Sequence, residues 1–387
     1  MAEWKTVRLG TIVSTNQDTY SLKENWQFVN YLDTGNITMN RIDKVQHINT
    51  SMDKLPSRAR RKVKSNSIIY STVRPNQLHY GIIKEQPKNF LVSTGFTVID
   101  VNMEKAVPDY IYYVLTQKEI TEHLQAIAEQ SVSAYPSLKP SDIENLEVLL
   151  PDIDTQKATV AILGVIDEKI KQNTEINNNL EQQAQAIYQQ MFIDNASSDW
   201  TEGTLSDIAD ITMGQSPSGS SYNEDGNGTI FFQGRAEFGF RFPTVRLYTT
   251  EPKRMACAND TLMSVRAPVG DLNVAHTDCC IGRGLAAIHS KNNHQSFVLY
   301  TMFSLKKQLD VFNGEGTVFG SINRNSLNEM PLLIPSSEKL DEFEALVAPM
   351  DAAIRNNCDE ICRLEQLRDS LLPKLMSGEL DVSDIEI

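Results

Sequence analysis

The sequence predicts an α+β fold in which two related mixed α/β domains alternate with two long helices that pair as an antiparallel coiled coil. Three observations support this prediction: the chain repeats itself, each repeat begins with a β-rich part, and each repeat closes with a heptad-like helical segment. We expect a first globular domain at 1–151, a central helical segment at 152–196, a second globular domain at 197–335, and a C-terminal helical segment with an acidic tail at 336–387.

The repeat is visible as pairs of similar segments. Each half begins with a tryptophan, in W-K-T-V-R-L-G-T-I at Trp4 and in W-T-E-G-T-L-S-D-I at Trp200. The offset between partners drifts from 196 to 184 along the chain, as short loop insertions would produce. Ser71 and Ser264 occupy the same place in one pair. The other pairs are 27–35 with 231–239, I-I-Y-S-T-V-R-P (68–75) with T-L-M-S-V-R-A-P (261–268), and 135–151 with 319–335.

The globular parts show mixed secondary-structure signals. The runs from Ser67 to Val73 and from Phe90 to Val101 favour strands, and Gly, Pro and Asn residues interrupt such runs. Residues 109–129 instead place apolar side chains at helical spacing. Neither half shows the regular strand–helix alternation of a doubly wound sheet, so we expect mixed domains.

The helical segments have a heptad-like apolar seam. Six residues repeat in register between them at an offset of 184, which excludes two unrelated surface helices. We expect Asp154 or Thr155 to cap the first helix. Pro349 and Pro373 should kink or shorten the second helix, and Gly378 stands where that helix should end. The residues expected to pair the helices are Ile166, Ile170, Asn173, Leu180, Ile187, Met350, Ile354, Asn357, Leu364 and Leu371.

Asparagine is unusually frequent in the first helical segment, which reads I-K-Q-N-T-E-I-N-N-N-L-E-Q-Q at 170–183. It is a mediocre helix former, so its presence on the seam needs a reason. Asn173 and Asn357 lie near the centres of helices taken as 155–193 and 337–376. Antiparallel pairing would bring these two centres together. We therefore expect Asn173 and Asn357 to form a buried polar pair that fixes register.

The formal net charge of −14 is unevenly distributed. The globular parts are close to neutral, at +1 for 1–150 and −3 for 197–335. The helical segments are acidic, at −4 for 151–196 and −8 for 336–387. A nearly neutral domain can present a local basic patch to phosphate groups, so the overall acidity does not exclude a nucleic-acid partner.

The sequence shows no signal-peptide pattern and no apolar run long enough to cross a bilayer, so we expect a cytoplasmic protein without membrane contact. Its five cysteines form no C-x-x-C pair, which favours free thiols. A zinc site built with His276 is an alternative with little support from the spacing, and no metal site is predicted.

The helical motifs resemble a known family. L-L-P-K-L-M-S-G-E-L (371–380), I-D-E-K-I (166–170) and the doubled domain–helix layout are similar to the specificity subunit of type I restriction–modification enzymes. The resemblance implies two target-recognition domains, each of which reads one half of a split double-stranded DNA target. It also implies two modification (methyltransferase) subunits that bind S-adenosylmethionine, and restriction subunits that use ATP and Mg where such subunits are present.

Basic and polar side chains are candidates for DNA contacts. The segment K-L-P-S-R-A-R-R-K-V-K (54–64) has six basic residues and no acidic one, and its proline and serine favour a helix start. The alternative interpretation of this segment is a charged helix face that only contacts water. Arg60-Arg61 aligns with Lys253-Arg254 at the offset that relates Ser71 to Ser264. The candidates are Arg58, Arg60, Arg61, Lys62, Lys64, Arg74, Asn76, Gln77, His79, Gln215, Ser216, Gln233, Arg235, Lys253, Arg254 and Arg266.

Motifs for catalysis are missing from the sequence. There is no N-P-P-[YF] or D-P-P-[YF] tetrapeptide of the kind that amino-methyltransferases use, and no G-x-x-x-x-G-K-[ST] phosphate loop. We therefore expect a non-catalytic DNA-recognition subunit with no cofactor of its own. Two alternatives stay open: a coiled-coil scaffold protein without DNA specificity, and an enzyme whose active site the sequence does not reveal.

Overall fold

The computed structural model describes residues 4–130, 136–314 and 320–382. Tyr135 and Phe319, which begin one pair of repeated segments, lie outside the described residues, as does the end of the acidic tail at 383–387. The chain divides into two compact units, Met1–Glu168 with Leu364–Ile387, and Lys169–Arg363. Each unit therefore contains one globular domain and a part of each long helix.

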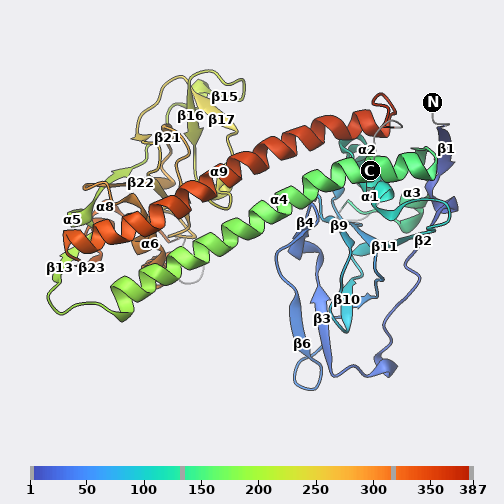
Figure 1. The fold of residues 1–387 in the computed structure, drawn as a ribbon, viewed down its shortest axis with the longest axis horizontal. Helices are drawn as coiled ribbons and strands as arrows, with labels where there is room; N and C mark the ends of the chain where they lie inside the picture. Colours follow the sequence, from blue (N-terminus) through green and yellow to red (C-terminus); the bar gives the residue numbers. More distant parts are fainter. Residues whose placement is uncertain (1–3, 131–135, 315–319, 383–387) are drawn as a thin grey trace. The chain divides into compact units, whose positions relative to one another are not determined.

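The first unit contains two four-stranded sheets, in the strand orders β2-β11-β8-β9 and β6-β3-β10-β7. Figure 1 labels strands of both sheets, among them β2, β9 and β11 of the first and β3, β6 and β10 of the second. Within them only β3 and β10 pair in parallel. Strand β1 pairs with β12 and joins the beginning of the domain to its end. The strands are β1 Lys5–Arg8, β2 Val13–Thr15, β3 Phe28–Leu32, β4 Ile37–Thr38, β5 Arg41–Ile42, β6 Gln46–Asn49, β7 Ala59–Arg61, β8 Ser67–Ser71, β9 Tyr80–Ile83, β10 Phe90–Ser93, β11 Phe96–Val101 and β12 Glu147–Leu150.

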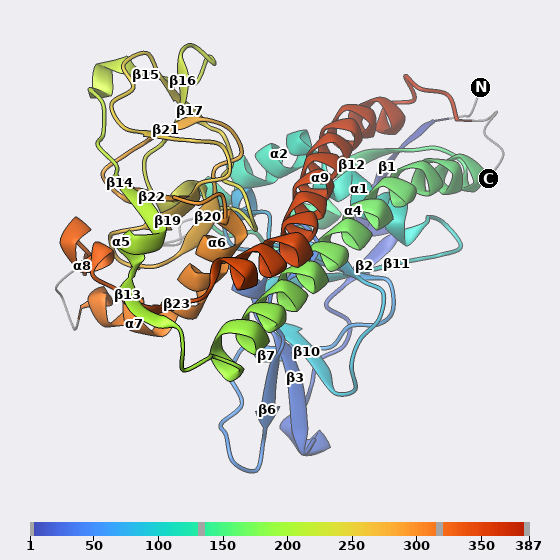
Figure 2. The same ribbon diagram turned by 60° about the vertical axis from the view of Figure 1, so that its left-hand side comes forward.

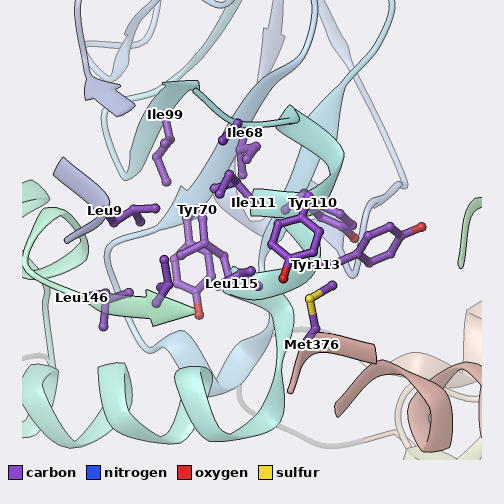
Figure 3. Packing of buried hydrophobic residues seen from close by; sticks show 14 of the residues in the cluster. Leu9, Ile68, Tyr70, Ile99, Tyr110, Ile111, Tyr113, Leu115, Leu146 and Met376 are labelled. Atoms are coloured by element: carbon purple, nitrogen blue, oxygen red, sulfur yellow. The ribbon is translucent and has the colours of Figure 1, made fainter. Parts of the chain in front are cut away.

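The helices of the first domain pack on one core. The helical pattern over 109–129 is two helices, α1 (Pro108–Thr116) and α2 (Lys118–Glu129), because the chain is extended at Gln117. A short helix, α3 (Pro140–Glu144), follows. Figure 3 shows buried aliphatic and tyrosine side chains of this core together with Met376, which belongs to the C-terminal helix α9 (Ser337–Met376). The C-terminal end of α9 thus completes the core of the first domain.

The second unit repeats this architecture (Figure 2). Its sheets have the orders β14-β22-β19-β20 and β15-β17-β16-β21-β18, and β13 pairs with β23. The end of α4 (Ile153–Tyr188), continued by a π-helical turn at Gln189–Asp194, packs into this core as α9 does in the first. The other elements are β13 Thr201–Thr204, α5 Leu205–Ile208, β14 Ala209–Met213, β15 Tyr222–Asn223, β16 Thr229–Phe232, β17 Leu247–Thr249, β18 Met255–Ala256, β19 Thr261–Ser264, β20 Leu272–Val274, β21 Cys279–Ile281, β22 Leu285–Ser290, α6 Gln295–Ser304, α7 Lys306–Asp310, α8 Arg324–Asn328 and β23 Pro331–Ile334.

The two domains agree in register as well as in order. Ser71 of β8 stands opposite Phe96 of β11, and Ser264 of β19 stands opposite Leu285 of β22. Strands β16 and β21 pair in parallel, as β3 and β10 do. The internal repeat read from the sequence is therefore a repeat of structure.

The ends of the long helices differ in part from the expectation. Asp152, rather than Asp154 or Thr155, caps α4 by accepting the Thr155 N–H at 2.9 Å, and this bond lowers the pKa of the Asp152 carboxyl. Helix α9 is a single element through Pro349 and Pro373, so the expected shortening does not occur. Both prolines are exposed, so water can reach the carbonyl groups that their missing N–H groups leave free. Gly378, with a φ of +75°, follows the end of α9.

Helices α4 and α9 pair antiparallel within each unit. In the first unit Arg368 bonds to Asp167 at 3.1 Å. In the second unit Asn173 donates to Glu360 at 2.8 Å, and Asn357 donates to Asn177 at 2.9 Å. The expected Asn173–Asn357 pair is therefore wrong by one helical turn. Of the other residues expected to pair the helices, two are buried (Ile166 and Ile354) and six are half-buried (Ile170, Leu180, Ile187, Met350, Leu364 and Leu371).

Candidate nucleic-acid interfaces

The centre of the basic segment at 54–64 is a short edge strand, and no part of the segment is helical. Ala59–Arg61 forms β7, which pairs with β10 and places Arg61 opposite Val92. On its other side the Arg60 carbonyl accepts the Tyr20 N–H at 2.7 Å. Because segments distant in the sequence satisfy its backbone groups on both sides, the strand is favoured over local helix formation.

The charges of this segment divide into paired and unpaired groups. Lys62 pairs with Glu24 at 2.7 Å and with Asp18 at 3.7 Å, and the hydrogen bond to Glu24 raises the pKa of Lys62. Lys64 lies 3.7 Å from Asp100. By contrast, no described carboxylate lies within ion-pair distance of the three arginines of the segment. The three are Arg58, Arg60 and Arg61.

Arg61 has the most unusual environment of these arginines. Burial lowers the pKa of its half-buried guanidinium, and its Nε has no hydrogen-bond partner among the described residues. A desolvated, unpaired guanidinium gains more from an incoming anion than a solvated one does. Arg61 is therefore suited to contact a phosphate group.

The second domain places an arginine at the same register. Strand β18 pairs with β21, and the Ile281 N–H bonds to the Arg254 carbonyl at 2.9 Å. Arg254 thus stands opposite Ile281 as Arg61 stands opposite Val92. Lys253 and Arg254 are exposed, and neither is ion-paired to a carboxylate in the described part of the chain. The sequence alignment of the two basic pairs therefore corresponds to a structural equivalence.

The turn between β21 and β22 gathers several candidates of the second domain. The Leu285 N–H bonds to the Gly282 carbonyl at 3.0 Å, so Arg283 occupies the outer part of a four-residue turn. Ser216 Oγ accepts the Arg283 N–H at 3.2 Å. The G-Q-S-P-S-G loop (214–219) is thereby fixed against this turn, and the Gln215 N–H bonds to the Ile281 carbonyl at 2.9 Å.

Glycines allow the loops to approach this turn. A Cβ atom on Gly282 would lie 2.8 Å from the Gln233 carbonyl oxygen, and one on Gly284 would lie 2.9 Å from it. The Val265 N–H bonds to the Gly284 carbonyl at 2.9 Å, which places Arg266 beside the same turn. The side chains that the sequence predicted separately are thus brought together around Arg283: Gln215, Ser216, Gln233 and Arg266.

Arg283 was not among the residues predicted from the sequence. Its exposed guanidinium has no ion pair or hydrogen bond to another described side chain. The signal that could have identified it is the sequence G-R-G, an arginine between two glycines at the end of an apolar run. Such a triplet is too short to be distinguished from an ordinary surface turn before the loops around it are known.

The first domain has an equivalent turn with a different residue. The Thr72 N–H bonds to the Gly95 carbonyl at 2.8 Å, as the Val265 N–H bonds to Gly284. Thr94 therefore occupies the position of Arg283. Its N–H bonds to the Arg58 carbonyl at 2.8 Å, so the basic segment anchors this turn. The basic segment of the first domain and the G-Q-S-P-S-G loop of the second hold equivalent turns.

Several of the remaining candidates form bonds within their own domain. The Asn76 N–H bonds to Gln125 of α2 at 3.2 Å, and His79 Nδ1 lies 2.6 Å from the Ile37 carbonyl oxygen. Arg235 forms an ion pair with Asp271. Arg74 has a φ of +49°, within the same turn as Asn76 and the exposed Gln77. This turn connects β8 with β9 and packs against α2, so the structure gives it a role inside the first domain.

Comparisons with known proteins agree with this architecture. The family described as type I restriction modification DNA specificity domain matches residues 1–182 and 197–347. A Methanocaldococcus jannaschii protein assigned as the MjaX type I restriction enzyme specificity subunit is 29% identical over 336 residues, which cover 81% of this chain and 78% of that protein. The HindI specificity subunit of Haemophilus influenzae is 25% identical over 466 residues, with 98% and 100% covered.

A solved structure shows the same fold. The S subunit of a type I restriction-modification system from M. genitalium superimposes with a TM-score of 0.60 at 17% identity, over 97% of this chain and 96% of that one. Two related domains held on a helix pair define a protein with two recognition modules. This chain belongs to the type I restriction modification DNA specificity family, and it is a specificity subunit. The alternative of a scaffold without DNA specificity is therefore set aside.

No helix in the described part of the chain is long and apolar enough to cross a membrane. The described residues also hold no group of three or more His, Cys, Asp or Glu side chains that could bind a metal ion. His276 instead lies 2.7 Å from Asp359 of α9.

Proposed function

We propose that each domain binds one half of a split DNA target through its edge arginine and the adjacent turn. The observation that supports this most directly is the equivalence of Arg61 and Arg254 in register and in lack of a carboxylate partner. The DNA backbone is the same for every sequence, so two domains that read different bases still need the same phosphate contact. An arginine at the same place in both domains is what such a shared phosphate contact requires.

Two modification subunits are the proposed protein partners of the helix pair. Large apolar side chains are exposed on the helices of both units: Val165 and Leu367 in the first, Ile176 and Leu346 in the second. Their exposed fractions range from 46% for Ile176 and Leu367 to 72% for Val165. The acidic helical segments should repel DNA, so these side chains fit a protein surface better than a nucleic acid.

The chemistry is proposed to reside in those partners. The modification subunits would bind S-adenosylmethionine, and restriction subunits, where present, would use ATP and Mg. This chain would supply recognition and no catalytic group of its own. We expect the isolated chain to bind DNA weakly or to be poorly soluble, because the helix surface that the partners cover would be exposed.

The test uses the chain assembled with its modification subunits. Methylation of genomic DNA, mapped with and without this gene, should lose one split motif when the gene is absent. Arg61→Ala and Arg254→Ala should each weaken binding to all target sequences alike. Each should also lower the slope of the logarithm of the binding constant against the logarithm of the salt concentration by about one unit per lost phosphate contact.

Lys62→Ala is the matched control. Lys62 is in the same basic segment, but its charge already pairs with Glu24 and Asp18. It should change the salt dependence much less than Arg61→Ala does. An unchanged methylation pattern after deletion of the gene would contradict the proposed function, and equal effects of Lys62→Ala and Arg61→Ala would contradict the assignment of Arg61.

A further inference from the structure

The residue that differs between two otherwise equivalent turns indicates where base specificity arises. We propose that Arg283 contacts bases of the second half-site, and that Thr94 at the equivalent turn gives the first domain a different preference. This inference rests on the proposed function, because it assumes that each domain binds DNA. An arginine that reads bases most often contacts O6 and N7 of guanine, so the ligand is duplex DNA with a guanine in the second half-site.

The backbone at Arg283 is held in place by its neighbours. Its N–H bonds to Ser216 Oγ at 3.2 Å, and the turn closes through the Leu285 N–H and the Gly282 carbonyl at 3.0 Å. The Gly284 carbonyl accepts the Val265 N–H at 2.9 Å. Binding therefore needs to order only the arginine side chain, which lowers the entropic cost and fixes the direction of approach.

The charge of Arg283 is available to DNA. Its side chain is exposed, and among the described residues no carboxylate pairs with it. Arg235, from a neighbouring loop, forms an ion pair with Asp271 that a base contact would have to break. Of these two arginines, Arg283 can therefore bind a base edge without losing an internal contact.

The comparison between the domains separates two kinds of contact. Arg61 and Arg254 are the same residue at the same register, which suits the sequence-independent phosphate contact. Thr94 and Arg283 occupy equivalent turns but differ in size, charge and hydrogen-bonding groups. Where the two domains share a backbone geometry but differ in the side chain, that side chain is suited to distinguish one half-site from the other.

The test measures binding of the assembled complex to a DNA library randomised in both half-sites. Arg283→Ala should reduce discrimination at one position of the second half-site by about tenfold to a hundredfold and leave the first half-site unchanged. Arg283→Lys should keep part of the preference, because lysine supplies charge without the bidentate geometry. Arg254→Ala should lower affinity evenly across all sequences.

A second variant tests the equivalent turn. Thr94→Arg should change the preference within the first half-site only, and thermal unfolding of each variant should match that of the unmodified chain because both side chains are at the turn surface. If Arg283→Ala lowers affinity evenly, or leaves the library profile unchanged while the unmodified complex selects a split target, the inference is wrong. If the unmodified complex selects no split target, the proposed function itself fails.

Discussion

Arg241 of the second domain forms an ion pair with Asp351 of α9, with 3.1 Å between Nη1 and Oδ1. Its side chain is only 4% exposed, and its Nη2 also bonds to Glu181 of α4 at 3.0 Å. One arginine of the globular domain therefore contacts both long helices. The Tyr300 hydroxyl donates to the same Asp351 at 2.9 Å.

The first unit has a related cluster with a different source of positive charge. The Tyr113 hydroxyl donates to Asp167 at 2.6 Å, and Asp167 also accepts from Arg368 at 3.1 Å. Tyr113 and Tyr300 come from equivalent helices, α1 and α6, and Asp167 and Asp351 are equivalent by the offset of 184. The arginine comes from α9 in the first unit and from the domain in the second.

Arg241→Leu should strongly destabilise the second unit. The change leaves two largely buried carboxylates, Glu181 and Asp351, without their cation, at a cost of about 3 kcal/mol. The control is Lys339→Leu, because the Lys339–Glu342 pair is about half exposed on both sides and such pairs contribute about 0 to 1 kcal/mol. Thermal and urea unfolding measure both. Equal losses for the two variants would show that the Arg241 pairs contribute no more than an exposed pair.

Glu344 should make stability depend on pH. Burial raises the pKa of its carboxyl above the ordinary 4.5, against the opposing effect of the Phe297 N–H bond. At pH values above 4.5, the folded chain holds the proton of the Glu344 carboxyl more tightly than the unfolded chain does. The free energy of unfolding therefore falls as the pH rises through this range. Glu344→Gln keeps an acceptor for the Phe297 N–H and removes the ionisation. It should therefore stabilise the chain at neutral pH and make little difference below pH 4.5.

Unfolding measured from pH 4 to 8 tests this prediction, with Glu342→Gln as control. Glu342 is exposed and pairs with Lys339, so its replacement should give no gain that grows with pH. A Glu344→Gln difference that stays constant over the range would rule out ionisation as its cause.

For the bond between the buried Asn177 and the half-buried Asn357, we expect removal of one partner to cost more than replacement of both. Asn177→Leu leaves the Asn357 amide without its acceptor and should cost about 1 to 3 kcal/mol, whereas the double change to leucine should be nearly neutral or stabilising. Asn178→Leu is the control, because Asn178 is exposed on the same helix. A double-mutant cycle gives the coupling. Additive effects of the two single changes would mean that the bond contributes nothing of its own.

Gly214→Ala should disturb recognition by the second domain. Its Cβ atom would overlap the Gly282 carbonyl, so the G-Q-S-P-S-G loop and the Arg283 turn could not keep their contact. Gly219→Ala is the matched control in the same loop, since nothing lies within 4 Å of its Cβ position. We expect Gly214→Ala alone to weaken binding to the second half-site. Equal binding by the two variants would show that the loop contact is not needed.

The repeat, the α+β class and the two long helices were accessible from the sequence, because they depend on local signals. Heptad spacing, cap residues and turn residues act within a few positions, and an internal repeat needs only self-comparison. The alignment of Ser71 with Ser264 and of Arg61 with Arg254 was therefore sufficient to place these residues at equivalent registers. The functional class followed from motifs at 166–170 and 371–380 together with this layout.

Contacts between distant segments were decided only by the tertiary structure. The centre of the basic segment, Ala59–Arg61, is a strand because β10, some thirty residues further on, supplies its backbone partners. Asn357 bonds to Asn177 rather than to Asn173 because side-chain packing along the whole helix pair sets the register, which the midpoints of the helices cannot give to within one turn. Arg283 is a candidate because glycines from separate loops let the backbones converge around its turn. Local sequence limits which residues can form a turn or a seam, but long-range hydrogen bonds and close backbone approach select which of them meet.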